Sequence, residues 1–217
     1  MIGLLLPARG PMRVLALGAH CDDVEIGAGG LILELRARPS GMRLHAFVAT
    51  SSPKRAAECR SSLTAFAGSD SSVDTATLPD GRLPAHFNAV KNHLTTLAAR
   101  PWDLVLAPHP QDAHQDHALL GALTPTAFRD HLILHYEIPK WDGDMGSLRP
   151  NVYIPLAEEQ MQHKWHLLNE HYPSQRRHDW WDAETFSGLA RLRGIECRSR
   201  YAEAFRVDKM KLGSGPH

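Results

Sequence analysis

The chain has 217 residues, which is enough for one α/β domain with a substantial core and short for two. Lys plus Arg and Asp plus Glu both number 24, so the net charge is zero and gives no electrostatic footprint for nucleic acid or an anionic membrane. The content of 43% hydrophobic and 22% charged residues is that of an ordinary soluble globular protein, and we expect no nucleic-acid partner.

The three cysteines, Cys21, Cys59 and Cys197, are odd in number and widely spaced. This usage predicts reduced thiols in a cytoplasmic protein rather than a disulfide framework. Cys21 could be a soft metal ligand, although a small filler beside a site is the commoner role. The opening residues 1–11 are too short and too interrupted for a signal peptide, and we expect no membrane-spanning segment, which needs about 20 apolar residues.

Strand and helix patterns alternate along the first two thirds of the chain. Short apolar runs predict buried strands, and longer periodic segments bounded by Ser, Pro or Gly predict helices. In chain order we expect strand 13–17, a helix from beyond the acidic pair to before Pro39, strand 44–50, helix 55–67, strand 72–78, helix 85–99, strand 103–107, helix 118–128 and strand 132–136. This alternation predicts a Rossmann-like parallel sheet flanked by helices, in the α/β class.

The last third of the chain is less regular. We expect helices at 157–170 and 183–193 and a final strand or extended segment at 201–207. We find no repeat, low-complexity segment or linker. Residues 1–212 are therefore expected to form one domain, and residues 213–217 a flexible tail.

Two clusters of imidazoles and carboxylates follow two of the expected strands. Residues 19–25 (AHCDDVE) come after the first strand, and residues 109–117 (HPQDAHQDH) come after the fourth. In doubly wound sheets, ligands bind beyond the carboxyl ends of the strands. We therefore expect the active site at that edge, with the two clusters side by side across a crevice.

The side chains in these clusters suit a hydrolytic metal site. Two His and one Asp can hold a zinc ion and leave the fourth position to water. Neighbouring carboxylates diverge, so Asp22 and Asp23 would divide the roles of ligand and general base. Of His114 and His117, one imidazole can bind metal while the other stabilises an oxyanion, and Asp116 can orient an imidazole.

At these residues the chain resembles the PIG-L/LmbE-like zinc-dependent N-deacetylases. The family's opening motif, Ala-His-Pro-Asp-Asp-Glu or a relative of it, stands here as AHCDDVE, with Cys21 where many members have proline and Val24 inserted before Glu25. The second motif, His-x-Asp-His, stands as HQDH at residues 114–117. Weaker similarities lie at residues 55–58, 78–81, 136–139, 174–175 and 201–205, so the resemblance spans residues 13–207.

The resemblance implies a ligand set and a base. His20, Asp23 and His117 would hold one zinc ion per chain, and Asp22 would be the general base. Fe²⁺ or Co²⁺ could substitute, since the same ligand types accept them. The cysteine at position 21 touches no ligand position of the motif, so the implied mechanism stays intact.

The resemblance also implies roles for four further residues. His114 would polarise the acetyl carbonyl and stabilise the oxyanion, and Asp116 would orient and charge-stabilise His114. Arg55 and Asp80, in two of the weaker motifs, are candidate substrate-contacting residues.

The implied function is hydrolysis of the N-acetyl group of an N-acetylglucosamine-type sugar or glycoconjugate, with a small-molecule amino sugar as the partner. A zinc amidase for another N-acyl group or a thiol-sugar conjugate would use the same side chains, and a non-catalytic metal-containing binding domain is a further alternative. A metallophosphoesterase would need two metals and more ligands. The aglycone and the oligomeric state, including a homo-oligomer, stay open.

Tryptophans could supply a face on which a sugar ring stacks, although most tryptophans belong to cores or interfaces. The adjacent pair Trp180 and Trp181 offers the better candidates, because one of two neighbouring side chains can be exposed. Trp102 and Trp141 are the other two considered.

Overall fold

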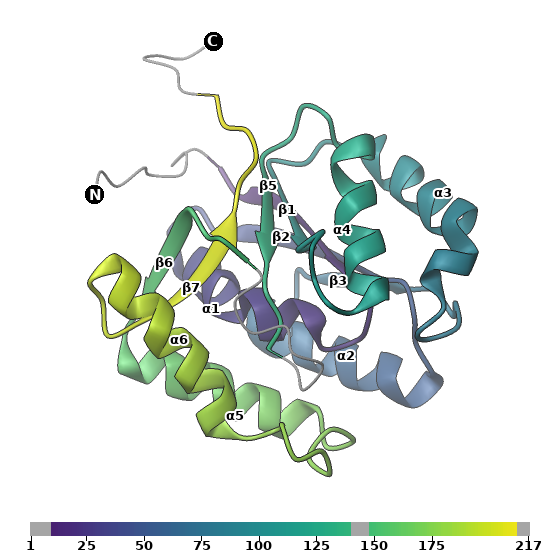
Figure 1. The fold of residues 1–217 in the computed structure, drawn as a ribbon. Coiled ribbons are helices and arrows are strands. Elements are labelled where there is room, and N and C mark those ends of the chain that lie inside the picture. The colour runs from purple at the N-terminus through teal and green to yellow at the C-terminus, as the bar shows by residue number, and fades with distance from the viewer. Residues whose placement is uncertain (1–9, 140–147, 212–217) are drawn as a thin grey trace.

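The computed structural model describes residues 10–139 and 148–211. The expected tail 213–217, most of the opening segment and Trp141 lie outside the described residues. Seven strands form one mixed sheet in the order β3-β2-β1-β4-β5-β7-β6, and helices cover both of its faces (Figure 1).

The elements between residues 12 and 136 confirm the predicted alternation. They are β1 Met12–Gly18, α1 Asp23–Ala37, β2 Met42–Val48, α2 Pro53–Ala67, β3 Ser72–Thr75, the 3₁₀ helix η1 Leu83–His86, α3 Phe87–Ala98, β4 Leu104–Pro108, α4 Gln115–Ala127 and β5 Ile133–Tyr136. The five strands pair in parallel. Helix α2 begins as the sequence predicts, with Ser52 accepting a hydrogen bond from the Arg55 amide and Pro53 in the first turn.

The last third adds α5 Glu158–His171, α6 Ala183–Cys197 and two strands, β6 Val152–Leu156 and β7 Tyr201–Arg206. Strand β7 runs antiparallel to both β5 and β6, so the sheet is mixed rather than wholly parallel. Strand β6 was not predicted from the sequence; it lies at the sheet edge, is largely half-exposed and contains Pro155. Proline fits an edge strand because it has no amide hydrogen to donate to a neighbour.

The two faces of the sheet carry separate cores. Helices α3 and α4 cover one face, and α1, α2, α5 and α6 cover the other (Figure 1). Helix α1 lies so close to its neighbours that none of its three glycines, Gly27, Gly29 and Gly30, has room for a side chain. A Cβ on Gly27 would lie 2.2 Å from Tyr136, and one on Gly30 would lie 2.7 Å from Leu156. The glycines of this segment therefore serve close packing.

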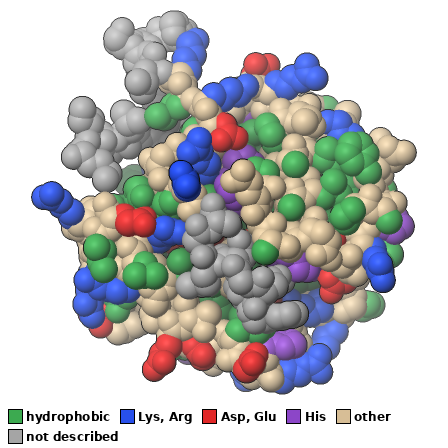
Figure 2. Space-filling model, in the orientation of Figure 1, with side chains coloured by type: hydrophobic (Ala, Val, Ile, Leu, Met, Phe, Trp, Pro, Cys, Tyr) green, Lys and Arg blue, Asp and Glu red, His purple; other side chains and the backbone are tan. Residues whose placement is uncertain are grey.

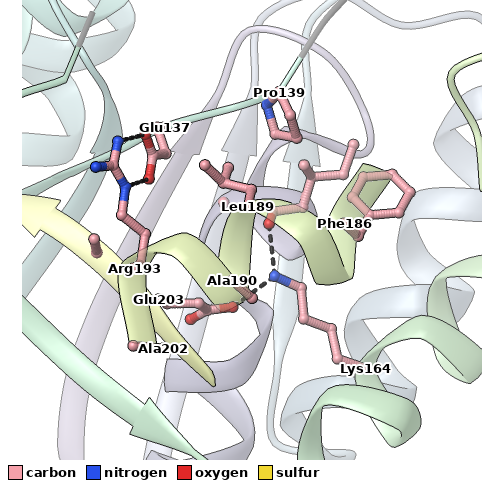
Figure 3. A pocket seen from close by; sticks show the side chains of 12 residues that line it. Glu137, Pro139, Lys164, Phe186, Leu189, Ala190, Arg193, Ala202 and Glu203 are labelled. Carbon is pink, nitrogen blue, oxygen red and sulfur yellow. Dashed lines mark hydrogen bonds and ion pairs between the residues drawn. The ribbon is translucent and has the colours of Figure 1, made fainter. Parts of the chain in front are cut away.

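Two buried ion pairs line a small pocket beside α1 (Figure 3). Lys164 Nζ lies 2.6 Å from Glu203 Oε1 and donates to the Ile26 carbonyl at 2.7 Å. The same Glu203 carboxylate accepts the backbone amides of Gly30 and Leu31, at 2.6 and 2.8 Å. The pair is thus bonded to the backbone in the middle of α1. It fastens α5 and β7 to the helix whose first turn carries Asp23.

The second pair joins Arg193 of α6 to Glu137, which follows β5, through two hydrogen bonds of 2.7 Å (Figure 3). Two parallel N–H···O bonds of this kind fix orientation as well as charge. The pair therefore holds α6 against the carboxyl end of β5.

The strand order reverses between β1 and β4, which pair through Val14 and Leu104. Such a reversal opens a crevice at the carboxyl ends of the strands. Residues 19–25 follow β1 and residues 109–117 follow β4, so the predicted juxtaposition of the two clusters is confirmed.

Basic and acidic side chains are interspersed on the face shown in Figure 2. In the part of the chain that the structure describes, we find no helix long and apolar enough to span a bilayer.

Candidate functional site

A cleft of about 1240 Å³ opens at the carboxyl ends of β1, β2 and β4. Six of the predicted site residues line it: His20, Asp22, Asp23, Arg55, Asp80 and His114. The other two, Asp116 and His117, are fully buried. All eight predicted residues thus belong to this cleft or to the packed layer that adjoins it.

Three side chains converge at the floor of the cleft. His20 Nδ1 lies 3.0 Å from His117 Nε2. Asp23 directs one carboxylate oxygen to each ring, 3.4 Å from His20 Nδ1 and 3.3 Å from His117 Nε2. Donor atoms about 2.0–2.1 Å from a tetrahedral ion are about 3.3 Å from one another, and these three distances, two of which use different oxygens of Asp23, are close to that value.

The outer nitrogens of both rings face carboxylates. His117 Nδ1 lies 3.0 Å from Asp112 Oδ2, and His20 Nε2 lies 3.0 Å from Asp80 Oδ1 and 3.5 Å from Asp116 Oδ2. A carboxylate favours a proton on the ring nitrogen that faces it. In the neutral ring the lone pair is then on the inner nitrogen. A histidine that binds a metal through one nitrogen carries its proton on the other, where a nearby carboxylate stabilises it.

Asp112 is a functional candidate that the sequence analysis missed. Its side chain is buried, and besides facing His117 it accepts the His114 amide at 2.8 Å. The available signal was a carboxylate besides Asp116 inside the second cluster, five residues before His117.

The electrostatics of this group favour a bound cation. Burial alone would lower the pKa of His117, but the carboxylates of Asp23 and Asp112 outweigh it and raise the value to about 9. Burial alone would raise the pKa of Asp23, but His117 and His20 hold it well below its ordinary value. The buried carboxylates thus stabilise positive charge at the point where the donor atoms meet.

His114 differs from the other two imidazoles in what its nitrogens contact. It caps α4, and its Nδ1 accepts the Asp116 amide at 3.2 Å. A neutral ring that accepts at Nδ1 carries its proton on Nε2, which makes Nε2 a donor rather than a ligand. The His114 ring lies 4.8 Å from that of His20 and 4.7 Å from that of His117, and its nitrogens could also reach a shared ion.

Asp116 holds the loop that forms the opposite rim. Its oxygens accept the Gly81 amide at 2.7 Å and the Leu83 amide at 3.0 Å. Burial alone would raise its pKa, but His20 and these two amides lower it. These contacts place Asp116 against the backbone of residues 81–83, and its carboxylate also faces His20. Its expected role in orienting His114 stays a prediction.

Asp22 is paired with Arg55 beside the convergence point. Asp22 Oδ1 lies 2.9 Å from Arg55 Nη2. The other terminal nitrogen of Arg55 donates to Glu58 at 2.9 Å and to Ser174 at 3.0 Å. These contacts connect two of the weaker motifs, at residues 55–58 and 174–175, to the first cluster, and Arg55 supports Asp22. Its contact with substrate stays a prediction.

The tryptophan pair divides as expected for two neighbouring side chains. Trp181 is buried in the core, whereas Trp180 is half-buried and lines the cleft. Trp102 stacks on His45 outside the residues that line the cleft.

Three solved structures share this fold. An N,N'-diacetylchitobiose deacetylase from Pyrococcus horikoshii is 21% identical, with a TM-score of 0.71 over 90% of this chain and 83% of that one. The A40926 pseudoaglycone deacetylase Dbv21 is 16% identical, with a TM-score of 0.72 over 93% and 99%. The 4-carboxy-2-hydroxymuconate hydratase GalB from Pseudomonas putida KT2440 is 13% identical, with a TM-score of 0.69 over 95% and 100%.

These similarities establish the fold, which holds hydratases as well as deacetylases, and leave the chemistry to the residues of the site. The sequence itself gives the family. The model of the GlcNAc-PI de-N-acetylase family matches residues 15–128, which include both clusters and Arg55. The chain therefore belongs to the PIG-L family.

Proposed function

We propose that this protein is a zinc-dependent hydrolase that removes the N-acetyl group from an N-acetylglucosamine-type sugar or glycoconjugate. The observation that carries the proposal is the convergence of His20 Nδ1, His117 Nε2 and the Asp23 carboxylate within 3.0–3.4 Å, at the floor of an open cleft. The family model and the two deacetylases among the structural neighbours support acetyl transfer to water as the reaction.

His20, Asp23 and His117 would hold the ion. Zinc in such a site supplies a Lewis acid and lowers the pKa of a bound water to about 7. The donor set of two imidazoles and one carboxylate leaves the open fourth position that catalytic zinc sites have.

Asp22 is the general base of the proposed reaction. It follows the ligand His20 by two residues and precedes the ligand Asp23, and its carboxylate is held by Arg55 at 2.9 Å. It takes a proton from the attacking water and delivers a proton to the departing amine. Proton transfer by a positioned carboxylate contributes on the order of 10²–10⁴ in rate.

His114 is the oxyanion donor. Because its Nδ1 accepts a backbone amide, the neutral ring carries its proton on Nε2, and this N–H would donate to the acetyl oxygen, which becomes negative when water adds to the carbonyl carbon. The C–N bond then breaks, and acetate and a free amine leave. Asp80, which is 76% exposed at the rim, and Arg55 are the proposed substrate contacts.

The test is acetate release by zinc-loaded protein from a panel of N-acetylglucosamine derivatives. We expect release by the wild type, a loss of 10²–10⁴ in kcat for Asp22→Asn with zinc retained, and no loss for Asp130→Ala, an exposed aspartate. Stripping the metal with a chelator should abolish release, and adding Zn²⁺, Fe²⁺ or Co²⁺ separately identifies the metals that restore it.

The alternatives predict different outcomes. An amidase for another acyl group or a thiol-sugar conjugate would hydrolyse N-propionyl or conjugate analogues and release no acetate from the panel. A binding domain would hold stoichiometric zinc and hydrolyse none of these compounds. Either result would overturn the deacetylase proposal while leaving the metal site intact.

A further inference from the structure

The segment between α5 and α6 forms part of the cleft wall. Five of its residues line the cleft: Gln175, Arg177, His178, Asp179 and Trp180. Successive turns order this segment, because the Gln175 amide donates to the Tyr172 carbonyl, that of His178 to Gln175, and that of Trp181 to His178.

The base of this segment is bonded to the residues around the proposed general base. Ser174 donates to Glu58 through its hydroxyl at 2.6 Å and its amide at 3.0 Å, and it accepts from Arg55. Arg55 in turn holds Asp22. Tyr172 donates to the carbonyl of Cys21, between His20 and Asp22. The position of the segment is therefore fixed relative to the reacting groups.

His178 and Trp180 form an aromatic pair within this wall. Their rings stack, with centroids 6.0 Å apart and an interplanar angle of 21°. Behind them, Trp180 contacts Trp181 edge-on at 5.4 Å and Phe186 at 6.3 Å, and both of these are core residues. Contact with the core holds the Trp180 indole in place, and the His178–Trp180 pair gives the cleft a preformed aromatic lining.

The size and the remaining lining of the cleft indicate the kind of ligand that meets this surface. Its volume of about 1240 Å³ exceeds the about 300–1,000 Å³ typical of small-molecule sites, so one amino sugar would leave much of it to water. Hydroxyl side chains line it as well: Thr50, Ser51, Ser52 and Thr77. A cleft lined by both aromatic and hydroxyl side chains suits a saturated ring that has apolar C–H faces and polar edges.

We propose that His178 and Trp180 form a second subsite, which binds a pyranose ring attached to the N-acetylated sugar. The aromatic pair then selects a disaccharide-sized glycoside over the free monosaccharide. This inference rests on the proposed deacetylase function for the sugar at the metal donors, but the second subsite can be tested by binding alone.

The experiment compares N,N'-diacetylchitobiose with N-acetylglucosamine. Binding of both sugars to the chelator-treated full chain is measured by calorimetry, and kcat/KM for acetate release is measured on zinc-loaded protein. We expect the wild type to prefer the disaccharide in binding. In Trp180→Ala, the ratio of disaccharide to monosaccharide affinity should fall about 5- to 10-fold, and the ratio of kcat/KM should fall equally, through KM.

Two variants serve as controls. Trp180→Phe keeps an aromatic face and should restore most of the preference. Trp102→Phe removes an indole that stacks on His45, where neither residue lines the cleft, and should leave the ratio at its wild-type value.

The remaining outcomes separate the two proposals. Equal weakening of both sugars by Trp180→Ala, an unchanged ratio, or a wild type that binds neither sugar would each overturn the second subsite. Selective binding of the disaccharide without acetate release would leave the subsite standing and refute the deacetylase function alone.

Discussion

Asp112 Oδ2 lies 3.0 Å from His117 Nδ1, and both side chains are almost completely buried. The contact fixes the His117 ring with Nε2 toward His20 and Asp23. It also places negative charge next to an imidazole that is proposed to bind a metal cation. A buried carboxylate in this position raises the basicity of the ligand and limits its rotation.

Replacing Asp112 by Ala should therefore weaken zinc binding by about 10- to 100-fold. Asp112→Asn keeps the size and an acceptor oxygen but loses the charge, so its zinc affinity should lie between that of the wild type and that of Asp112→Ala. Competition against a chromogenic chelator measures the affinity. Asp103→Asn is the matched control, since Asp103 pairs with Arg13 on the surface, just before β4. Wild-type affinity in Asp112→Ala would exclude a role of this carboxylate in the metal site.

His114 and His117 allow a paired test of ligand against oxyanion donor. Asn at position 114 can still cap α4, because it is among the preferred N-cap residues, but it has no imidazole N–H for the substrate. We expect His114→Asn to keep stoichiometric zinc and to lose on the order of 10²–10³ in kcat. His117→Asn should lose the zinc itself. Metal content and acetate release are measured on the same samples, and loss of zinc from His114→Asn would make His114 a ligand.

The buried pair of Lys164 and Glu203 should matter for folding more than for chemistry. Lys164→Met leaves the Glu203 charge buried without its cation, which costs about 3–5 kcal/mol of unfolding free energy. Arg13→Met breaks an exposed pair with Asp103 and should change stability little. Urea denaturation at pH 7.5 measures both. If Lys164→Met is as stable as the wild type, the pair adds nothing beyond what an apolar side chain supplies.

The sequence predicted most of the parallel part of the sheet because buried strands such as β1 and β4 are continuous apolar runs. The edge strand β6 has no such run, since it is half-exposed and includes Pro155. Strand β6 forms because it pairs with β7, some fifty residues later in the chain. The local sequence pattern around β6 does not indicate this distant pairing.

In the candidate site, too, local motifs could be predicted from the sequence, whereas contacts between distant segments could not. The proposed metal ligands lie in two short motifs, and strand order brings these motifs together. The partners of these donors come from elsewhere: Asp80 from the loop after β3, and Arg55, which holds Asp22, from α2. These contacts depend on packing of side chains across elements. Sequence analysis could name Arg55 and Asp80 as candidates, but it could not assign them the neighbours that the structure gives.

Stability should fall at acid pH in part through His135. The ring is buried at the carboxyl end of β4, donates Nδ1–H to the Pro108 carbonyl, and lies 3.9 Å from Asp208 on its other side. Burial lowers the pKa of His135 by more than Pro108 and Asp208 raise it, so the pKa lies below the ordinary value for histidine. The unfolded chain thus binds a proton more readily than the native state. Free energy of unfolding is therefore lost as the pH falls below about 6.5, the ordinary value for histidine.

Replacing His135 by Gln keeps a donor for Pro108 and removes this titration. Between pH 7.5 and 5, the wild type should lose more unfolding free energy than His135→Gln, by at most about 1.4 kcal/mol per pH unit, the slope for one proton. Urea titrations at several pH values, with chelator in all samples, give the two slopes. His163→Gln, an exposed histidine on α5, should keep the wild-type slope. A ring that is buried in its neutral form must contribute to the loss of stability at acid pH. Equal slopes for the wild type and His135→Gln would therefore show that other groups cause this loss.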